Sequence, residues 1–384
     1  MTSQNPASLP GANLPVLRGH NTALVLGLLR AAGPEGVSRL ELAAHTGLTP
    51  QAVSKITSRL RDEGLAAEAG RRASTGGKPR TVLRLVPGAR HALGLHLDRD
   101  EITAVLADLA GEPVAVRRAP LPFGEGAPAL LDTVAEVVAV LRADGPPGRV
   151  LGVGVAAPGP LDHAAGVLHR VTGFPQWDGY PLRAALAERL ALPVVLDKDT
   201  NAAALVPARA AGSFAYLHLG TGLGAGLVLD GTLYRGPRTG AGEFGHQVLH
   251  LDGPPCHCGK RGCVEALCLA AMDRGAPDEA ARLLGVAAAN LVELLDIDRV
   301  LLGGRTVLGH PEVFLRGVSD ALDARIRLRG ASAPVGPSDP SSEGSGSVPV
   351  SLLPGGARAV ADGAAELVLG EVFGAGRLAA GRST

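Results

Sequence analysis

A short stretch in the second half of the chain holds the residue types that bind a metal ion. Three of the four cysteines are Cys256, Cys258 and Cys263, and His246 lies upstream of them. One imidazole and three thiolates are a complete tetrahedral ligand set for a structural zinc ion. A disulfide is disfavoured, because no secretory signal is evident and Cys256 and Cys258 are too close in sequence to pair comfortably. His257 is an alternative nitrogen ligand in place of His246.

The sequence around these residues resembles the signature of the ROK family, a group of repressors, open reading frames and sugar kinases. The resemblance rests on three runs: GEFGH at 242–246, CHCG at 256–259 and GCVE at 262–265. It implies that His246 binds sugar as well as zinc, and that Glu243 and Glu265 contact sugar hydroxyls. It also implies a two-lobed, actin-like ATPase body of α/β structure that carries a zinc knuckle.

Charge is distributed unevenly along a chain whose formal net charge is zero. Residues 1–90 contain 12 Lys and Arg against 5 Asp and Glu, whereas the rest of the chain is acidic. A basic module beside an acidic body indicates a polyanionic partner for the basic part only. No apolar run is long enough to span a membrane, and the first residues lack the features of a signal peptide. We therefore expect a cytoplasmic protein with no membrane partner.

The first part of the basic module has the spacing of a helix-turn-helix. After a flexible tail at residues 1–19, apolar residues predict a helix over 21–32. Ser38 can cap a second helix over 39–46, which ends at Gly47. Two short helices joined by a glycine-containing turn are typical of this motif.

The third helix of the module is the candidate DNA-recognition helix. Thr49 caps it, and Pro50 occupies the first position, where a missing N–H is tolerated. Val53, Ile56 and Leu60 repeat on one face and should pack inward. The residues of this helix and its cap that are expected to face DNA are Thr49, Gln51, Ser54, Lys55 and Ser58.

Two short strands follow the third helix and predict a wing. LAAEAG and TVLRLVP flank the basic segment RRASTGGKPR, so the module is a winged helix-turn-helix over residues 20–88. Lys78 and Arg80 give this segment a cationic tip of the kind that can enter a minor groove. The alternative is a small protein-interaction domain with a solvated basic loop. Basic charge, a polar outer face on the third helix and the cationic tip favour operator DNA.

The body opens with a turn that departs from the family's pattern. HLDRDE at 96–101 aligns with the kinase turn Asp-x-Gly-Gly-Thr-Lys, whose backbone cradles ATP phosphates. The glycines, the threonine and the lysine are replaced by Asp98, Arg99, Asp100 and Glu101. Carboxylates repel phosphate, and side chains at the glycine positions prevent close backbone approach. We therefore expect no efficient kinase activity.

A second family motif follows the predicted strand at 193–196. The family's form is Asn-Asp-x-Asn, whose aspartate is the general base in the kinases. Asp199 and Asn201 match, which implies a ligand-binding role for Asp199 and a catalytic role only in a kinase. The sugar-binding asparagine is replaced by Lys198, a cation that would hold Asp199 ionised and can donate to a hydroxyl. Gly173 replaces another sugar-binding asparagine. The alternative for Asp199 is a helix-start carboxylate stabilised by the macrodipole.

Together these features predict a cytoplasmic, sugar-responsive transcriptional regulator of the repressor kind, which is not an enzyme. Its partners would be operator DNA and a sugar or sugar phosphate, and the resemblance implies a homodimer or homotetramer. One alternative is an ATP-dependent sugar kinase with Asp199 as base, and another is a ligand-blind DNA-binding regulator. The predicted parts are a tail (1–19), a winged helix-turn-helix (20–88) and a sugar-kinase-like body (89–384) with lobes joined near residue 199 and a low-complexity loop at 331–348.

Overall fold

The chain folds into two compact units. The computed structural model describes residues 14–72, 80–146, 148–171, 173–210, 212–328 and 347–374. The first unit contains the described parts of Met1–His91, Asp108–Glu112 and Leu369–Thr384, and the second contains those of Ala92–Ala107 and Pro113–Val368. Across these described segments, no helix combines the length and the apolar character needed to cross a membrane.

The first unit combines helices with a small antiparallel sheet. Its elements are α1 (Leu14–Ala31), η1 (Gly33–Glu35), β1 (Val37–Ser38), α2 (Arg39–Thr46), α3 (Pro50–Asp62), β2 (Ala66–Arg72), β3 (Arg80–Leu85) and η2 (Pro87–Ala89). The strands lie in the order β1-β3-β2 and pair antiparallel. The two strands predicted on either side of the basic segment are therefore present as β2 and β3, whereas Lys78 lies outside the described residues.

Side-chain caps fix the starts of α2 and α3 as the sequence predicted. The Ser38 hydroxyl accepts a hydrogen bond from the Glu41 amide at 3.3 Å, and the Glu41 carboxylate accepts one from the Ser38 amide at 2.7 Å. This reciprocal pair is a capping box. The Thr49 hydroxyl accepts from the Ala52 amide at 3.3 Å. Each cap satisfies amides that have no partner inside the helix.

The start of α1 differs from the prediction. The helix begins at Leu14 rather than at residue 21, so residues 14–19 are helical and not part of a tail. Pro15 is tolerated because it lies in the first turn, where its missing N–H would have no intrahelical partner.

The faces of α3 follow the predicted pattern with one exchange. Val53 and Leu60 are fully buried, but Ile56 is only partly buried and Thr57 takes an inward position instead. A threonine can be buried there because its hydroxyl is satisfied: it accepts from Arg39 Nε at 3.2 Å. The residues on the exposed face are Gln51, Ser54, Lys55 and Ser58.

The first unit also includes segments from distant parts of the chain. Arg30 of α1 donates to the Ala110 carbonyl at 3.1 Å from Nε and 3.0 Å from Nη2. Its guanidinium lies 4.7 Å from the ring centroid of Phe373, which follows α11 (Ala359–Val372). This one side chain therefore joins α1 to the turn at 108–112 and to the last described residues.

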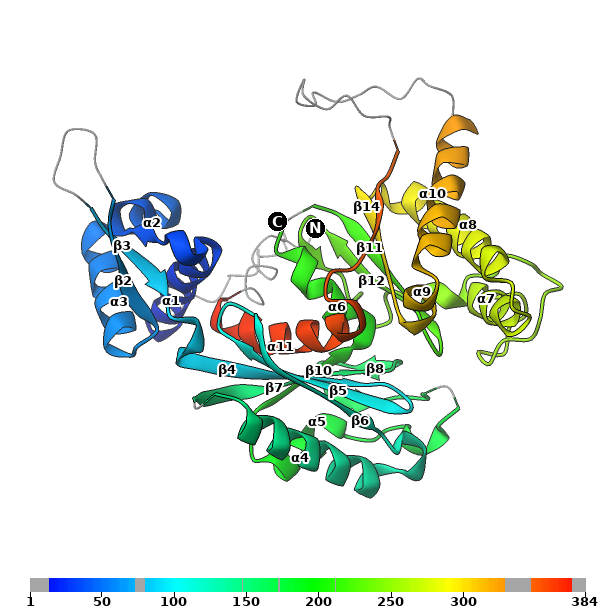
Figure 1. Cartoon of the computed structure of the whole chain (residues 1–384), viewed down its shortest axis with the longest axis horizontal. Coiled ribbons are helices and arrows are strands. Elements are labelled where there is room, and N and C mark those ends of the chain that lie inside the picture. Colours follow the sequence, from blue (N-terminus) through cyan, green and yellow to red (C-terminus); the bar gives the residue numbers. More distant parts are fainter. Residues whose placement is uncertain are drawn as a thin grey trace, which may run out of the picture. The chain divides into compact units, whose positions relative to one another are not determined.

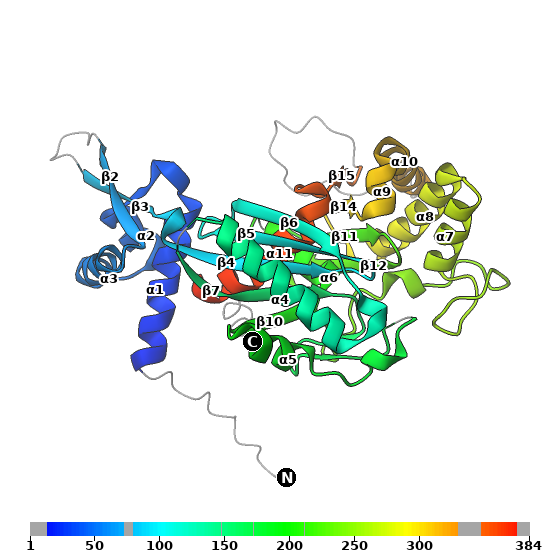
Figure 2. The same ribbon diagram turned by 60° about the horizontal axis from the view of Figure 1, so that its bottom comes forward.

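The first lobe of the second unit is built on a five-stranded sheet in the order β10-β7-β4-β5-β6. Its elements are β4 (Arg90–Leu97), β5 (Glu101–Asp108), β6 (Pro113–Pro120), η3 (Phe123–Glu125), α4 (Ala127–Asp144), β7 (Arg149–Ala157), β8 (Leu161–Asp162), β9 (Val167–Leu168), η4 (Pro175–Trp177), α5 (Leu182–Leu190) and β10 (Val194–Lys198). α4 and α5 cover one face of the sheet and α11 covers the other (Figures 1 and 2).

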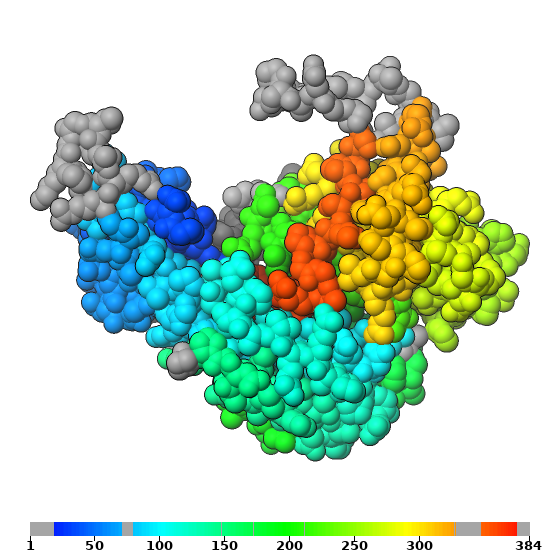
Figure 3. All heavy atoms as spheres, viewed as in Figure 1, coloured from blue at the N-terminus to red at the C-terminus, as the bar shows by residue number. Residues whose placement is uncertain are grey.

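The second lobe contains another five-stranded sheet, in the order β13-β12-β11-β14-β15. Its elements are α6 (Asp199–Ala208), β11 (Phe214–Leu219), β12 (Leu223–Leu229), β13 (Thr232–Leu233), η5 (Phe244–His246), α7 (Val264–Asp273), α8 (Pro277–Leu295), β14 (Arg299–Gly303), α9 (Arg305–Gly309), α10 (Pro311–Leu328), β15 (Val350–Leu352) and η6 (Gly356–Arg358). In the space-filling view, the segment that contains β15 lies beside α10 (Figure 3).

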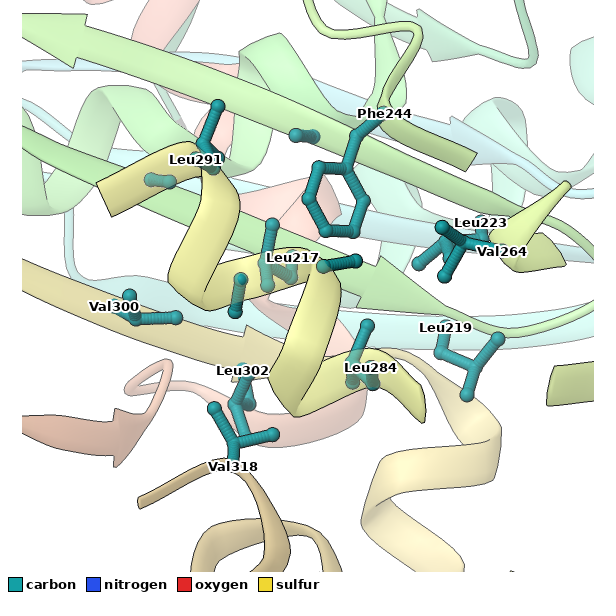
Figure 4. Close-up of a cluster of buried hydrophobic side chains, with 14 of the residues drawn as sticks. Leu217, Leu219, Leu223, Phe244, Val264, Leu284, Leu291, Val300, Leu302 and Val318 are labelled. Atoms are coloured by element: carbon teal, nitrogen blue, oxygen red, sulfur yellow. The ribbon is translucent and has the colours of Figure 1, made fainter. Parts of the chain in front are cut away.

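The core of the second lobe anchors the segment that precedes the cysteines. Phe244 points from η5 into a buried cluster between the sheet and α8 (Figure 4). Its neighbours in that cluster include Leu217 of β11, Val264 of α7 and Leu291 of α8. Burial of a phenylalanine contributes about 1.5–3 kcal/mol. Because Glu243 and His246 flank this anchor in sequence, their backbone positions are fixed by the core.

Two glycines let helices lie directly on the sheets. A Cβ on Gly226 of β12 would lie 2.1 Å from the Thr200 carbonyl of α6. A Cβ on Gly154 of β7 would lie 1.7 Å from the Ala364 carbonyl of α11. Side chains at these positions would push the helices away from the strands. The close contact of α6 with β12 fixes the position of Asp199 at the start of that helix.

Candidate ligand pocket and metal centre

A cavity of about 680 Å³ lies in the second unit, where segments of both lobes converge. The turn after β4 contributes Asp98 and Arg99, and β11 with its following turn contributes His218 and Thr221. The five side chains that the sequence predicted as ligand-binding all line this cavity: Lys198, Asp199, Glu243, His246 and Glu265. The fold thus brings the predicted ligand residues and the altered turn at 98–101 to one site.

Asp199 is held rigidly at the cavity wall. It is the first residue of α6, and its Oδ1 accepts from the Thr200 amide at 2.6 Å. The first turn of a helix favours a negative charge through the macrodipole. The Thr200 hydroxyl donates to the Ala225 carbonyl at 3.0 Å and ties α6 to β12. The carboxylate is therefore both a helix-start group and available to a hydroxyl in the cavity.

Lys198 forms its ion pair with Glu243 and not, as the sequence suggested, with Asp199. The lysine is only 6% exposed. Its ammonium donates to Glu243 Oε1 at 3.2 Å and to the Ala241 carbonyl at 3.0 Å. The pair places a donor beside an acceptor, which suits a hydroxyl that both accepts and donates a hydrogen bond.

Asp197 braces the strand end that carries Lys198 and Asp199. It is 1% exposed and accepts from Arg235 Nε at 2.7 Å, from Asn201 Nδ2 at 2.9 Å and from the Lys198 amide at 2.7 Å. A buried carboxylate needs such partners, because an unpaired buried charge is strongly destabilising. Asn201, which matches the family motif, therefore supports the site through Asp197.

Glu265 lies in the first turn of α7. Its Oε2 accepts from the Leu223 amide at 2.8 Å, which links α7 to the start of β12. Gly173, which also lines the cavity, has φ +83°, a value that glycine adopts without strain. Trp177 is buried and donates from Nε1 to the Phe123 carbonyl at 3.0 Å, so its role is packing.

The predicted metal ligands are brought together. The ligand atoms of His246, Cys256, Cys258 and Cys263 all lie within 4.8 Å of one another. The Cys256 sulfur is 3.6 Å from His246 Nδ1, and the Cys258 and Cys263 sulfurs are 3.6 Å apart. A disulfide requires about 2.05 Å, and all four cysteines of the chain are free.

The cluster has the chemistry and the size of a tetrahedral site. One nitrogen and three sulfur donors are a preferred set for Zn²⁺, with bonds of about 2.0–2.3 Å that allow such ligand separations. His257, the alternative ligand, lines the cavity and is not part of the cluster. The turns around the cysteines are tight: a Cβ on Gly262 would lie 1.6 Å from the His250 carbonyl. The residues present therefore fit a zinc ion.

The turn after β4 is closed by an arginine that the sequence did not single out. Arg305, the first residue of α9, donates from Nη2 to Asp98 Oδ2 at 2.5 Å and to Asp100 Oδ1 at 2.6 Å. Its Nη1 donates to Asp100 Oδ2 at 2.9 Å. Arg305 directly follows Gly303 and Gly304, and its place after this glycine pair is the only feature of the sequence that could have drawn attention to it.

Asp98, Asp100 and Arg305 form an ion cluster in which the opposite charges stabilise one another. Burial alone would raise the pKa of Asp98, but His96 and Arg305 outweigh it, so the pKa lies below its ordinary value. The hydrogen bond from Arg305 lowers the pKa of Asp100, and the two carboxylates raise the pKa of Arg305. Both carboxylates are therefore ionised at neutral pH.

Two histidines lie close to each other near the ion cluster, and His96 is close to both Asp98 and Asp199. The ring centroids of His96 and His218 are 6.4 Å apart, and the Tyr216 hydroxyl is 2.9 Å from His218 Nδ1. Burial lowers the pKa of His96 despite the nearby carboxylates of Asp98 and Asp199. His96 is therefore neutral at pH 7. His218, which lines the cavity, is a candidate ligand contact that sequence reasoning missed.

The residues predicted to contact DNA lie in the first unit. Gln51, Ser54, Lys55 and Ser58 are exposed on α3, whereas the Thr49 hydroxyl is used as the helix cap. Arg80 is exposed at the start of β3.

The model of the ROK family matches residues 92–275. The chain is 30% identical to a xylose repressor of Caldicellulosiruptor bescii, over 60% of this chain and 59% of that protein. It is 31% identical to the DNA-binding transcriptional dual regulator NagC of Escherichia coli K12, over 66% of this chain and 64% of that protein. The chain thus spans about three fifths of the length of these relatives.

Solved structures support the two-lobed, actin-like α/β fold. A ROK hexokinase from Thermus thermophilus shares 30% sequence identity with a TM-score of 0.56, and the match covers 72% of this chain and 96% of that one. A ROK family transcriptional regulator, a homolog of the E. coli MLC protein, gives a TM-score of 0.72 at 22% identity over 93% and 97% of the two chains. At this level of identity, the second match is evidence for the fold only.

Proposed function

Because the chain belongs to the ROK family, we propose that it is a sugar-responsive, DNA-binding transcriptional regulator, a repressor without efficient kinase activity. The observation that carries the proposal is the cavity: the polar residues for a sugar converge on it, whereas the turn at 98–101 is closed by Arg305. Relatives named xylose repressor and NagC support the regulatory reading. A cytoplasmic location follows from a DNA partner.

The proposed effector is a sugar or sugar phosphate bound in the cavity. Asp199 and Glu265 would accept hydrogen bonds from hydroxyls, and the pair of Lys198 and Glu243 would bind a further one. His246 would contact the ligand from the metal-binding segment. Each of these side chains lines the same cavity, which is large enough for a monosaccharide.

A structural zinc ion is proposed at His246, Cys256, Cys258 and Cys263, on the geometry of their ligand atoms. Bound zinc supplies cross-links between segments that are far apart along the loop, and so contributes folding energy. His246 would then be oriented by the metal site toward the cavity that it lines.

The first unit is proposed to be a winged helix-turn-helix that binds operator DNA. α3 would enter the major groove, and the wing residues Lys78 and Arg80 would contact phosphates or the minor groove. The proposed homodimer, or a homotetramer made of such dimers, would present two copies of α3 to a palindrome. The exposed polar face of α3 and the basic charge of residues 1–90 support this assignment.

A gel-shift titration at several salt concentrations, with a selected operator and scrambled DNA, tests the DNA proposal. Gln51→Ala should relax specificity and cost roughly 1–3 kcal/mol, because glutamine reads adenine bidentately. Lys78→Ala should weaken all sequences alike and reduce the salt slope by about one. Arg142→Ala, a charge removal in the second unit, is the control. DNA binding that neither Gln51→Ala nor Lys78→Ala alters would contradict the assignment.

A thermal-shift screen of sugars and sugar phosphates tests the effector, because a ligand that binds the native state raises the melting temperature. Asp199→Asn should abolish the shift. If no sugar binds while operator binding persists, the protein is the ligand-blind regulator. A coupled ADP-release assay addresses the kinase alternative: turnover that Asp199→Ala abolishes would establish a kinase with Asp199 as base.

A further inference from the structure

Three turns of the second unit meet beside the cavity, to whose lining they contribute Asp98, Arg99 and Thr221. They follow β4, β11 and β14, and side chains join them. The Thr221 hydroxyl donates to Asp98 Oδ1 at 3.4 Å, and the Thr306 hydroxyl donates to the Gly220 carbonyl at 3.3 Å. Arg305 completes the junction through its bonds to Asp98 and Asp100. Turns at strand ends are the places where α/β folds bind phosphate groups.

Two of the cations that could receive a phosphate at this junction are already engaged. Arg305 is shared between two ionised carboxylates, and Lys198 is paired with Glu243. Arg99 also lines the cavity, but it is flanked by carboxylates. Its guanidinium and the Glu265 carboxylate both lie against Gly222, and Asp98 is its neighbour in the chain. A phosphate entering here would meet the three carboxylates of Asp98, Glu265 and Asp199, and the Arg99 guanidinium can offset only part of their repulsion.

We propose that Asp98 and Asp100, with Arg305 held between them, exclude phosphate groups from the side of the pocket that these turns form, so that the effector is an uncharged sugar and not a sugar phosphate. The identity of the ligand as a sugar rests on the proposed function. The exclusion itself depends only on the residues at the junction. Asp98 and Asp100 act by repulsion and by occupying Arg305, which would otherwise be a bidentate phosphate ligand.

Inorganic pyrophosphate is a probe of this exclusion that requires no knowledge of the sugar. Thermal shift and calorimetry at constant ionic strength should show no binding to the unaltered protein at millimolar pyrophosphate. Asp98→Asn/Asp100→Asn should bind pyrophosphate, because two repulsive charges are lost and Arg305 is released. Its dissociation constant should lie at least about tenfold below the highest pyrophosphate concentration at which the unaltered protein shows no binding. Adding Arg305→Gln to that variant should abolish the gain.

The matched control is Asp278→Asn/Asp320→Asn, which removes two carboxylates from α8 and α10 and should leave pyrophosphate binding absent. If the double variant at the turn is unstable, the single change Asp100→Asn, at a side chain that is 61% exposed, is the substitute. Pyrophosphate binding to the unaltered protein, or no gain in a folded turn variant, overturns the proposal.

A paired screen of glucose with glucose 6-phosphate, and of N-acetylglucosamine with its 6-phosphate, tests the consequence for the effector. A sugar should stabilise the protein more than its phosphate ester does, and preferential stabilisation by a phosphate ester overturns the proposal. If the unaltered protein bound neither operator DNA nor any sugar, that result would contradict the proposed function instead. The pyrophosphate comparison would still decide whether the junction excludes phosphate.

Discussion

The segment at 242–265 and the turn at 98–101 wall the same cavity, but they differ in what they keep of the family pattern. The segment retains its glutamates, its histidine and its cysteines, and each side chain has a partner or a ligand position. The turn has exchanged two glycines for Asp98 and Arg99, and its carboxylates hold Arg305. On the proposed function, the pocket keeps the residues for a sugar and has lost those for a phosphate.

Physical chemistry predicts that the two regions tolerate substitution differently. Four metal ligands must lie at fixed distances, so replacement of one disrupts the whole site. In the ion cluster of the turn, Asp100 is exposed to solvent and Arg305 is nearly half exposed, so a change at Asp100 should cost little. The following predictions test that difference, beginning with the change expected to have the largest effect.

Cys258→Ser should remove zinc from the purified protein and destabilise the second unit by several kcal/mol, because structural zinc contributes folding energy. Metal analysis and thermal unfolding are the measurements. His257→Ala, one residue away and outside the cluster, should retain one zinc per chain and an unchanged melting temperature. Equal zinc content in both variants would contradict the assignment of the ligands.

Gly262→Ala and Gly259→Ala compare two glycines of the same segment. Both have positive φ, +63° and +88°. Only Gly262 is crowded, because a Cβ at this position would lie 1.6 Å from the His250 carbonyl oxygen. Gly259→Ala should cost about 1–2 kcal/mol from backbone strain alone. Gly262→Ala should cost at least about 3 kcal/mol, because strain and steric overlap add. Chemical denaturation would measure both, and a smaller loss at 262 than at 259 would argue against this packing.

His96, beside the turn, should make stability depend on pH. Its folded pKa lies below the ordinary value of 6.5 because of burial, so the unfolded chain binds a proton first as the pH falls. The unfolding free energy should therefore decrease between pH 7 and pH 5, by up to about 1.4 kcal/mol per pH unit. His96→Gln should flatten this slope in denaturation curves. A variant as pH-sensitive as the unaltered protein would mean that His96 is protonated in the fold.

Asp100→Asn should have the smallest effect on stability, below about 1 kcal/mol, because Asp100 is 61% exposed and Arg305 is 46% exposed. Denaturation at low and high salt would measure it, and salt should reduce the difference further. A loss as large as that of Cys258→Ser would show that the turn is as constrained as the metal-binding segment.

The sequence predicted the features that depend on residue type and local spacing. The four predicted metal ligands come together, the predicted ligand-binding residues such as Asp199 line one cavity, and Ser38 and Thr49 cap α2 and α3 as expected. Caps follow from a single side chain and the amides of the next turn. Motif spacing likewise carries its own geometry, so these features need no knowledge of the rest of the fold.

Partners that are distant in the chain could not be predicted in this way. Arg305 and Asp98, Arg235 and Asp197, and Lys198 and Glu243 meet only because two sheets and their connecting helices bring strand ends together. Many arginines could neutralise a given carboxylate, and the sequence does not rank them. The residue types thus indicated a candidate metal-binding segment and a polar pocket. Tertiary structure decided which charges within that pocket remain available, because pairing depends on distances that only packing sets.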